Sequence, residues 1–277
     1  MGSLPTSRVT VSRPFYHCGV DYVGPVILRE GKRHNARNHK SYIAVFVYFA
    51  TKAIHIELVS DLTTDAFLRA FKRFIARRSR PSNMYSDNGT TFVGAQRQLK
   101  EMYKFYLSQQ TQADLERAHL TFEEISTVLY EIEAILNSRP ITPLSEDPNN
   151  MSYIFLGHFL VGTTLNRLPQ PDLTDVNENR LVRWQRVEQL RQNFWRRWSA
   201  EYLHSLQERN KWKSNKGIQL EPGQHVLIKQ QNLAPLQWAI DRVQDVHPGP
   251  DNVARTATVH TFKGSFVRPF SRFAILI

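Results

Sequence analysis

Residues 41–59 read SYIAVFVYFATKAIHIELV, and this stretch sets the fold class of the 277-residue chain. It is rich in β-branched and aromatic residues and is long enough for two strands, with a turn near Thr51–Lys52. The apolar segment PFYHCGVDYVGPVIL at 14–28 predicts a further strand before it, and a basic loop is expected at 29–40. The chain therefore begins with three predicted strands.

An amphipathic helix follows these strands, with Thr63 or Thr64 as its cap and Arg80–Pro81 at its end. Its apolar residues recur at a spacing of three to four: Phe67, Ala70, Phe71, Phe74 and Ile75. A short strand at 83–86 then leads to Asp87 and an Asn-Gly turn, and 93–107 predicts another helix. This order of elements predicts an α/β domain with a mixed sheet.

The second half of the chain has a different composition, because all five Trp residues lie at or beyond Trp184. Thr121-x-x-Glu124 is a capping box that opens an apolar helix, and prolines are expected to keep 141–150 irregular. A second long helix is predicted at 180–207. Short strands punctuated by Gly and Pro then predict a small β-barrel, at 225–229, 238–246, 254–262 and 265–270.

Basic residues outnumber acidic residues. The chain has 36 Lys and Arg against 25 Asp and Glu, a formal net charge of +11 and a pI near 9.9. Basic residues gather in three clusters, at 29–40, 69–80 and 180–197. Clustered positive charge favours a polyanionic partner, so we expect the chain to bind nucleic acid.

Composition and hydropathy exclude several classes of protein. Hydrophobic residues make up 41% of the chain, which excludes a wholly disordered protein. The single cysteine, Cys18, excludes an internal disulfide framework and a multi-cysteine zinc site, and it fits a reducing compartment. No segment has the ~20 apolar residues of a membrane span, and no apolar signal region is seen. We therefore expect no membrane partner and an intracellular location, in the nucleus or cytoplasm.

Two acids stand out by their position. Asp21 interrupts an apolar strand, where a carboxylate is costly unless it is paired or binds a metal. Asp87 follows the short strand at 83–86, at an end where open α/β sheets bind ligands. Carboxylates on adjacent strands are able to hold Mg²⁺ for phosphoryl transfer. The alternative is structural, with Asp87 in an Asx turn and Asp21 paired to a Lys, and spacing alone does not decide between the two.

Longer motifs resemble the integrase core of Bel/Pao-type retrotransposons. The core resemblance rests on HCGVDYVGP (17–25), KSYIAVFVYFATKAIHIELVSDLTTDAFLRAFKRFIARR (40–78) and YSDNGTTFVGA (85–95). Two further segments resemble the later part of the same polyprotein region: LTFEEISTVLYEIEAILNSRPITPLS (120–145) and GHFLVGTTLNRLPQPDL (157–173). Two last segments resemble the helix and small β-barrel that follow the integrase core in this family: RWQRVEQLRQNFWRRWSAEYLHSLQERNKW (183–212) and PGQHVLIKQQNLAPLQW (222–238).

The resemblance implies a fold, a site and an activity. It implies an incomplete ribonuclease-H-like core at 1–150, a connecting helical region at 151–215 and a small SH3-like β-barrel at 216–277. It also implies a site of three carboxylates that holds Mg²⁺ or Mn²⁺, and DNA strand transfer as the reaction. Asp21 and Asp87 match the first two carboxylates of the family, as catalytic residues and metal ligands.

The third carboxylate is where this sequence departs from the family. The family's further strand, loop and Glu-bearing helix have no counterpart here, and the simplest interpretation is an internal deletion near 108–120. Glu123 is the alternative third ligand, because the 35 residues between it and Asp87 match the family's spacing. However, Glu123 and Glu124 also fit the first turn of a helix, where acids favour the positive end of the helix dipole.

The deletion has structural and functional consequences. Loss of a strand and its covering helix predicts poorer cover for Phe46, Val47 and Ile54, and two remaining acids predict weak Mg²⁺ binding. The function implied by the resemblance is DNA integration, and the alternative is an inactive DNA-binding remnant. In either case basic side chains are expected to contact phosphates: Arg73, Arg77, Arg78, Lys229, Arg255, Lys263 and Arg268.

A third hypothesis is an assembly module that forms a homo-oligomer or docks a partner. Its surface would be the Trp-rich helix, through Trp184, Trp195 and Trp198. The alternative for these three rings is burial in the chain's own core.

Overall fold

The computed structural model describes residues 12–31, 36–86, 119–144, 152–166, 169–213, 220–230, 233–249, 254–261 and 264–276. The strands of the first part are β1 (His17–Arg29), β2 (Asn38–Tyr48), β3 (Ile54–Val59), β4 (Asn83–Tyr85), β5 (Pro140–Pro143) and β6 (Tyr153–Phe155). Those of the last part are β7 (His225–Ile228), β8 (Ile240–Pro248), β9 (Ala254–Thr261), β10 (Gly264–Pro269) and β11 (Phe273–Ile275). The helices are α2 (Thr64–Arg78), α5 (Phe122–Asn137), α6 (Leu156–Val161) and α7 (Arg183–Lys213), with 3₁₀ helices η2 (Glu178–Arg180) and η3 (Phe270–Arg272). The predicted mixed α/β class is confirmed. Among the described residues, no helix has the length and apolarity needed to cross a membrane.

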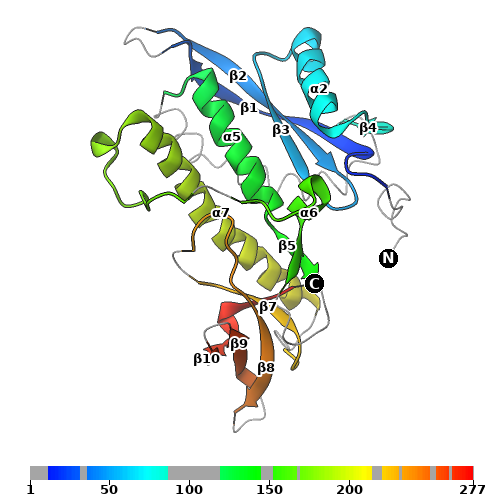
Figure 1. Ribbon diagram of the computed structural model, residues 1–277, viewed down its shortest axis with the longest axis vertical. Coiled ribbons are helices and arrows are strands. Elements are labelled where there is room, and N and C mark those ends of the chain that lie inside the picture. Colours follow the sequence, from blue (N-terminus) through cyan, green and yellow to red (C-terminus); the bar gives the residue numbers. More distant parts are fainter. Residues whose placement is uncertain are drawn as a thin grey trace.

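The first sheet has the strand order β3-β2-β1-β4 (Figure 1). β1, β2 and β3 are antiparallel neighbours, and β4 pairs in parallel with β1. The predicted turn between β2 and β3 is confirmed: Tyr48 N donates to Ala53 O at 2.9 Å, and Lys52 has a φ of 65°. The predicted loop at 29–40 is shorter, because β1 reaches Arg29 and β2 begins at Asn38.

The helix α2 covers one face of the first sheet. Thr63 caps it as predicted, with its Oγ1 accepting a hydrogen bond from Ala66 N at 3.2 Å. Alternate residues of β2 point to this face, and the ring of Phe46 stacks on that of Phe74 with 4.3 Å between centroids. The period of two along β2 therefore separates two cores, one on each face of the sheet.

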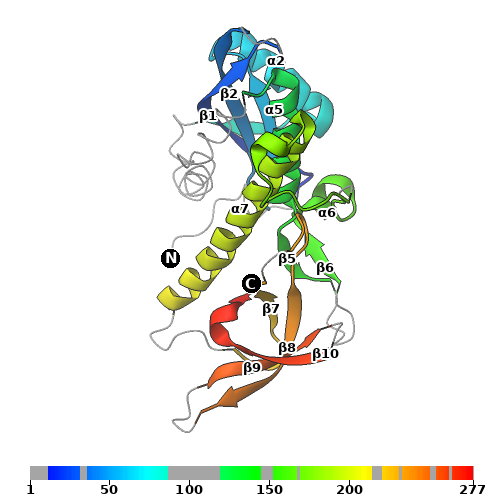
Figure 2. The same ribbon diagram turned by 90° about the vertical axis from the view of Figure 1, so that its left-hand side faces the viewer.

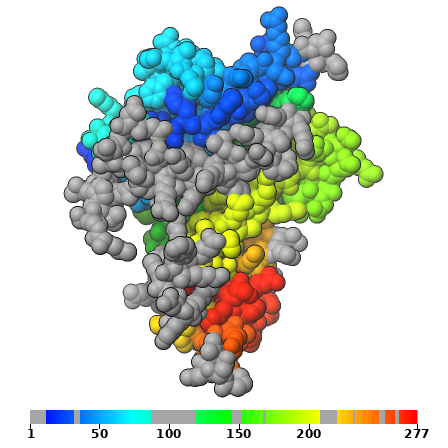
Figure 3. Space-filling model, turned by 180° about the vertical axis from the view of Figure 1, so that it is seen from behind, coloured from blue at the N-terminus to red at the C-terminus, as the bar shows by residue number. Residues whose placement is uncertain are grey.

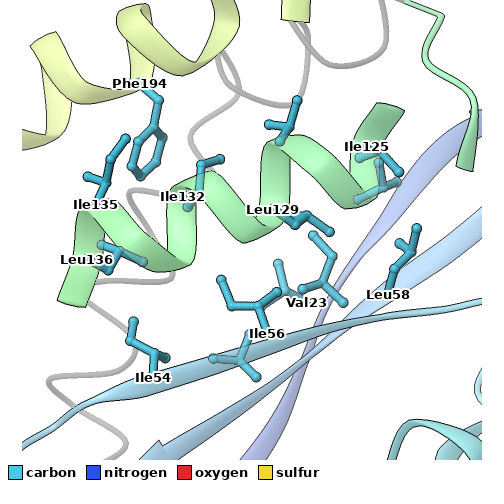
Figure 4. Close-up of a cluster of buried hydrophobic side chains, with 14 of the residues drawn as sticks. Val23, Ile54, Ile56, Leu58, Ile125, Leu129, Ile132, Ile135, Leu136 and Phe194 are labelled. Atoms are coloured by element: carbon cyan, nitrogen blue, oxygen red, sulfur yellow. The ribbon is translucent and has the colours of Figure 1, made fainter. Parts of the chain in front are cut away.

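The opposite face of the first sheet packs on α5, and α5 in turn packs on α7. Figure 4 shows Ile54 and Ile56 of β3 facing Leu129 and Leu136 of α5, with Phe194 of α7 on the far side of the helix. The expected poor cover of Phe46, Val47 and Ile54 is wrong, because these side chains are only 0%, 2% and 1% exposed. They are covered because α2 packs on one face and α5, backed by α7, packs on the other.

Among the described residues, the outer edge of β3 is bonded to side chains rather than to another strand. Asn137 of α5 accepts from Ile54 N and donates to Ile54 O, both at 2.9 Å. Glu133, one turn earlier on α5, accepts from Ile56 N at 2.8 Å, and Arg73 of α2 donates to Leu58 O at 2.9 Å. Unpaired strand edges invite pairing with other chains, and these side chains satisfy the edge within the fold.

The segment after α5 differs from its prediction. α5 begins with the predicted capping box, in which Thr121 N donates to Glu124 Oε2 at 2.8 Å. The prediction that 141–150 is irregular is wrong for its first residues, because β5 pairs with β6 in a two-stranded sheet. Proline is compatible with such a short strand, because a strand with a free edge does not require every N–H to be a donor.

The helix α7 connects the first sheet to a C-terminal sheet. Figures 1 and 2 show it running from α5 to the strands β7–β10. Figure 3 shows the molecule from behind, with the first sheet (blue) at one end and the C-terminal sheet (orange and red) at the other. The C-terminal sheet has the order β10-β9-β8-β7-β11 with every pair antiparallel. Four of its strands were predicted from the sequence. The fifth, β11, is only three residues long and was not.

An aromatic cluster fixes the end of the 233–238 segment against α7. Trp238 contacts Trp195, Trp198 and Tyr202, with ring centroids 5.0, 5.6 and 5.5 Å away. Trp195 and Trp198 are buried, so the docking hypothesis is wrong for these two rings, because they pack in the chain's own core. Trp184 is 57% exposed and keeps the surface position that the hypothesis required.

Asp241 is an acid in the core of the C-terminal sheet, and it predicts a dependence of stability on pH. It is paired across the strands with the buried Val226, and burial raises its pKa from 3.8 to about 6. The folded state therefore binds this proton more tightly than the unfolded state, so stability decreases as pH rises from about 4 to about 6. At pH 7, Asp241→Asn is expected to raise the free energy of unfolding by about 1–2 kcal/mol, a range reduced for solvent screening.

Urea denaturation of both proteins at pH 4 and pH 7 checks this prediction, with the gain expected only at pH 7. An equal difference at the two pH values would contradict the assignment to the Asp241 carboxyl, because the two proteins differ only in that titrating group.

Candidate metal centre and nucleic-acid interface

Asp21 lies on β1, which has a neighbour on each side in the first sheet. Its backbone pairs with Val45 of β2, and its Oδ1 accepts a hydrogen bond from Tyr22 N at 2.7 Å. Alternation along the strand places its side chain on the face opposite Val20, away from α2. The side chain is partly exposed, so the carboxylate has access to solvent and to a ligand.

Asp87 lies outside the described residues, which end at Ser86 in this part of the chain. The strand that precedes it, β4, runs parallel to β1 with Gly19 opposite Tyr85. Within the described residues, no group of three or more His, Cys, Asp or Glu is placed to hold a metal ion. That finding does not include Asp87, so a site formed by Asp21 and Asp87 stays a prediction.

Glu123 lies at the wrong end of β1 to join Asp21. Thr121, just before α5, forms a bridge with Arg29, which is the last residue of β1. The register partners of Asp21 and Arg29 on β2 are Val45 and Asn38, seven positions apart, which is a separation of about 23 Å at ~3.3 Å per residue. A glutamate side chain spans only a few ångströms. The structure therefore does not bring Asp21 and Glu123 together.

The acids at the start of α5 have structural roles instead. Glu123 is exposed in the first turn of the helix, and Glu124 completes the capping box and binds Arg183 of α7, whose Nη2 lies 2.7 Å from Glu124 Oε2. Burial raises the pKa of Glu124, but the hydrogen bonds from Arg183 and Thr121 outweigh it and hold the pKa at about 2. Glu124 therefore joins the beginnings of two helices.

A buried network of His55, Glu57 and three arginines lies between β3 and α2. Arg73 Nε donates to Glu57 Oε2 at 2.6 Å, and Arg77 forms an ion pair with the same carboxylate. His55 Nε2 lies 3.0 Å from Glu57 Oε1, while Arg78 Nε donates to His55 Nδ1 at 3.3 Å. His55 therefore lies between the carboxylate of Glu57 and the guanidinium of Arg78.

The network keeps Glu57 ionised. Burial raises the pKa of Glu57, but hydrogen bonds from His55, Arg73 and Arg77 outweigh burial and lower the pKa from 4.5 to about 2. The stabilisation from the ionised carboxylate is therefore complete above pH 4.5 and is lost as pH falls toward 2. Arg73 and Arg77 have side chains that are 45% and 43% exposed, so each keeps one surface toward solvent.

Glu133 of α5 extends the network to the other side of β3. Its Oε1 accepts from Arg78 Nη2 at 2.6 Å and lies 3.6 Å from His55 Nδ1. Burial raises the pKa of Glu133, but His55, the backbone N–H of Ile56 and Arg78 together lower it. Two carboxylates therefore face three guanidinium groups. The arginines predicted to bind phosphate have partners within the chain, and Arg78 is largely enclosed.

Sequence reasoning did not identify His55, Glu57 and Glu133. The available signal is the strand IHIELV, in which two polar residues alternate with apolar ones on a strand that is otherwise buried. Because a buried charge requires a partner, this pattern predicts an ion-pair network behind β3. The partners themselves come from α2 and α5, which lie 16 or more residues away.

The basic residues of the C-terminal sheet form a second group. Lys229 follows β7, and Arg255 and Arg268 are exposed on β9 and β10, while Lys263 lies outside the described residues. The guanidinium of Arg268 lies over the ring of Phe266, 5.6 Å from its centroid. Arg268 is opposite Ala257, so it shares a face of the β9–β10 pair with Arg255. A cation beside an exposed aromatic ring suits contact with phosphates and bases.

The two groups of cations do not form one patch. Figure 1 shows α2, which carries Arg73, Arg77 and Arg78, at the end of the molecule remote from β9 and β10. The structure therefore places the predicted phosphate contacts at two separated sites.

Comparison with known proteins gives a family of unknown function and a distant structural likeness. Residues 182–276 match the model of a family of unknown function (DUF5641), which spans α7 and the C-terminal sheet and less than half of the chain. No curated protein matches the chain. Among solved structures, the chain is similar to one in the cryo-electron microscopy structure of a simian T-cell lymphotropic virus intasome in complex with PP2A regulatory subunit B56 gamma. The identity is 13%, the TM-score is 0.25, and the match covers 100% of this chain and 84% of that one. At that TM-score the likeness carries no argument about fold or function.

Proposed function

We propose that the chain is an integrase-related DNA-binding protein of the Bel/Pao retrotransposon type, with a ribonuclease-H-like first sheet. One observation carries this proposal: β1 lies between an antiparallel β2 and a parallel β4. Gly19 and Tyr85 are register partners, and Asp21 and Asp87 each follow two residues later in the sequence. A parallel pair with this register supports two carboxylates that lie side by side.

The C-terminal sheet supports the second half of the proposal, an SH3-like barrel. Five short antiparallel strands have the order β10-β9-β8-β7-β11, and the 3₁₀ helix η3 separates β10 from β11. A buried apolar core of Val226, Val243, Val259 and Phe273 lies inside it. Small barrels of this kind bind nucleic acid through their loops and strand ends, and here Arg255 near the start of β9 and Arg268 near the end of β10 are exposed.

The proposed chemistry belongs to Asp21 and Asp87. Their carboxylate oxygens are the ligands that Mg²⁺ or Mn²⁺ prefers, and Asp21 is partly exposed on its sheet face. When bound, the metal activates the attacking oxygen and stabilises the leaving oxygen of a phosphoryl transfer. Phosphate contacts from Lys229, Arg255 and Arg268 hold the DNA, with the outward surfaces of Arg73 and Arg77 adding charge at the other end.

A second candidate function is DNA binding without catalysis. The observation that favours it is the position of Glu123, which the Arg29–Thr121 bridge holds at the far end of β1 from Asp21. With two carboxylates in place of three, the site holds a divalent cation weakly. The two candidates share the DNA-binding surfaces and differ only in the metal-dependent reaction.

Nicking or strand transfer on a labelled DNA duplex in Mg²⁺ or Mn²⁺ tests the proposal. Asp21→Asn and Asp87→Asn are each expected to reduce the rate by about 100-fold or more, because catalysis depends on the position of the ligands. Glu123→Gln is the matched control and is expected to leave the rate unchanged. All three variants are expected to bind the duplex as the wild type does, with affinity that falls steeply with salt.

The outcomes separate the two candidates. Duplex binding without any metal-dependent reaction supports the non-catalytic protein. A reaction that survives both aspartate substitutions overturns the proposed metal site. An absence of duplex binding at low salt overturns both candidates.

A further inference from the structure

A cavity of about 500 Å³ lies at the junction of α7 with the segments 170–175 and 228–238. None of the residues that line it belongs to the first sheet or to the proposed metal centre. Its apolar wall is formed by Trp195, Leu203, Ile228, Pro235 and Trp238. A concave site of this volume with aromatic walls is typical of a small-ligand pocket.

The wall of the cavity is held in place by internal hydrogen bonds. Gln192 Oε1 accepts from Leu173 N at 2.8 Å, and its Nε2 donates to Pro171 O at 2.9 Å, which fixes the 170–175 segment to α7. On the other side, Trp195 Nε1 donates to Leu233 O at 2.9 Å. Because both segments are bonded to the helix between them, the cavity is formed before any ligand enters it.

The polar groups around the cavity have a distinctive chemistry. Besides Gln192, three glutamines line it with amide groups: Gln170, Gln230 and Gln237. Lys229 and Arg196 supply positive charge, and Arg196 is positioned by Thr174 and by Asp175, 3.4 Å away. Asp172 and Asp175 supply acceptors. Amides match the edges of bases, cations match phosphate, and carboxylates accept from hydroxyl or amino groups.

We propose that this cavity binds a single nucleotide. Its base enters against the partly exposed ring of Trp238, because aromatic rings stack with any base, and its phosphate lies at the mouth near the exposed Lys229. The nucleotide comes from one of two sources, a free mononucleotide or an unstacked nucleotide of a bound strand. The inference is independent of Asp21 and Asp87, and only the second source rests on the proposed function.

Quenching of tryptophan fluorescence by AMP and by adenosine tests the proposal on the full chain, because Trp195 and Trp238 line the cavity. Ala200→Phe adds a ring at an exposed position that lines the cavity, and it is expected to weaken AMP binding by about 10-fold or more. Ala76→Phe makes the same change at an exposed position on α2 and is expected to alter binding by less than about 2-fold.

Lys229→Ala distinguishes the phosphate from the base. It is expected to weaken AMP binding by about 10-fold, the effect of one charge-assisted hydrogen bond, and to leave adenosine binding within about 2-fold. Lys229 is exposed, so this variant is expected to fold even if Ala200→Phe does not. Single-stranded oligodeoxyadenylate that displaces AMP identifies a bound strand as the source, and failure to displace it identifies a free nucleotide.

Two results overturn the inference. One is an absence of quenching by millimolar AMP in the wild-type protein. A cavity that binds a peptide instead of a nucleotide would give this result. The other is AMP binding by Ala200→Phe that equals that of the wild type. Duplex binding by Ala200→Phe, measured in parallel, is expected to be normal, so failure of the nucleotide site is distinguishable from failure of the proposed function.

Discussion

Glu133→Ala is expected to lower the free energy of unfolding by about 3–5 kcal/mol. The substitution removes the acceptor of the buried Ile56 N–H on the edge of β3, and it removes a carboxylate that binds Arg78 beside the buried His55. A buried donor left without an acceptor costs about 1–3 kcal/mol, and an enclosed cation left without its carboxylate adds to that cost. Urea denaturation followed by circular dichroism at pH 7 measures the change.

Glu123→Ala is the matched control, since it makes the same change at an exposed position on the same helix. Its expected cost is below about 1 kcal/mol, the value of an acid near a helix N-terminus. Glu133→Gln keeps an acceptor for Ile56 N and loses only the charge, so its cost is expected to lie between the two alanine variants. Equal costs for Glu133→Ala and Glu123→Ala would show that Glu133 does not stabilise the edge of β3.

The elements that the sequence predicted well are those determined by local chemistry. The hairpin of β2 and β3 follows from the composition of 41–59 and a tight turn, and both helix caps, Thr63 and Thr121, bond to residues three positions later. The network behind β3 was not predicted, because Glu133 reaches Ile56 across 77 residues. A local sequence pattern does not identify a partner that is this far away in the sequence and comes close only in the folded chain.

In the candidate site, too, local features were predictable from the sequence and long-range contacts were not. The strand that carries Asp21 is a local feature, and its position in β1 was predictable. Glu123 had a matching spacing from Asp87, but sequence spacing does not fix where a helix begins, and the bridge from Thr121 to Arg29 is a long-range contact. The basic cluster on α2 was counted as free charge, although Glu57 and Glu133 neutralise much of it. Charge counts identify cations without identifying their partners.

Trp238→Ala is expected to lower the free energy of unfolding by about 3 kcal/mol, the lower end of the cost of truncating a large aromatic residue, because its ring is partly buried against the core. Its ring makes edge contacts with three aromatic rings of α7, and its Nε1 lies 3.2 Å from Ser138 Oγ at the end of α5. It therefore joins the 233–238 segment to both helices. Urea denaturation followed by circular dichroism measures the change.

Trp184→Ala provides the control, because Trp184 is 57% exposed and its loss is expected to cost less than about 1 kcal/mol. Trp238→Phe keeps a ring but loses the bond to Ser138, and its cost is expected to be intermediate. Because α7 packs on α5 at one end and on β7 and β11 at the other, loss of Trp238 removes one of the contacts that make these parts unfold together. If Trp238→Ala is no less stable than Trp184→Ala, the aromatic cluster does not hold the C-terminal sheet to the rest of the chain.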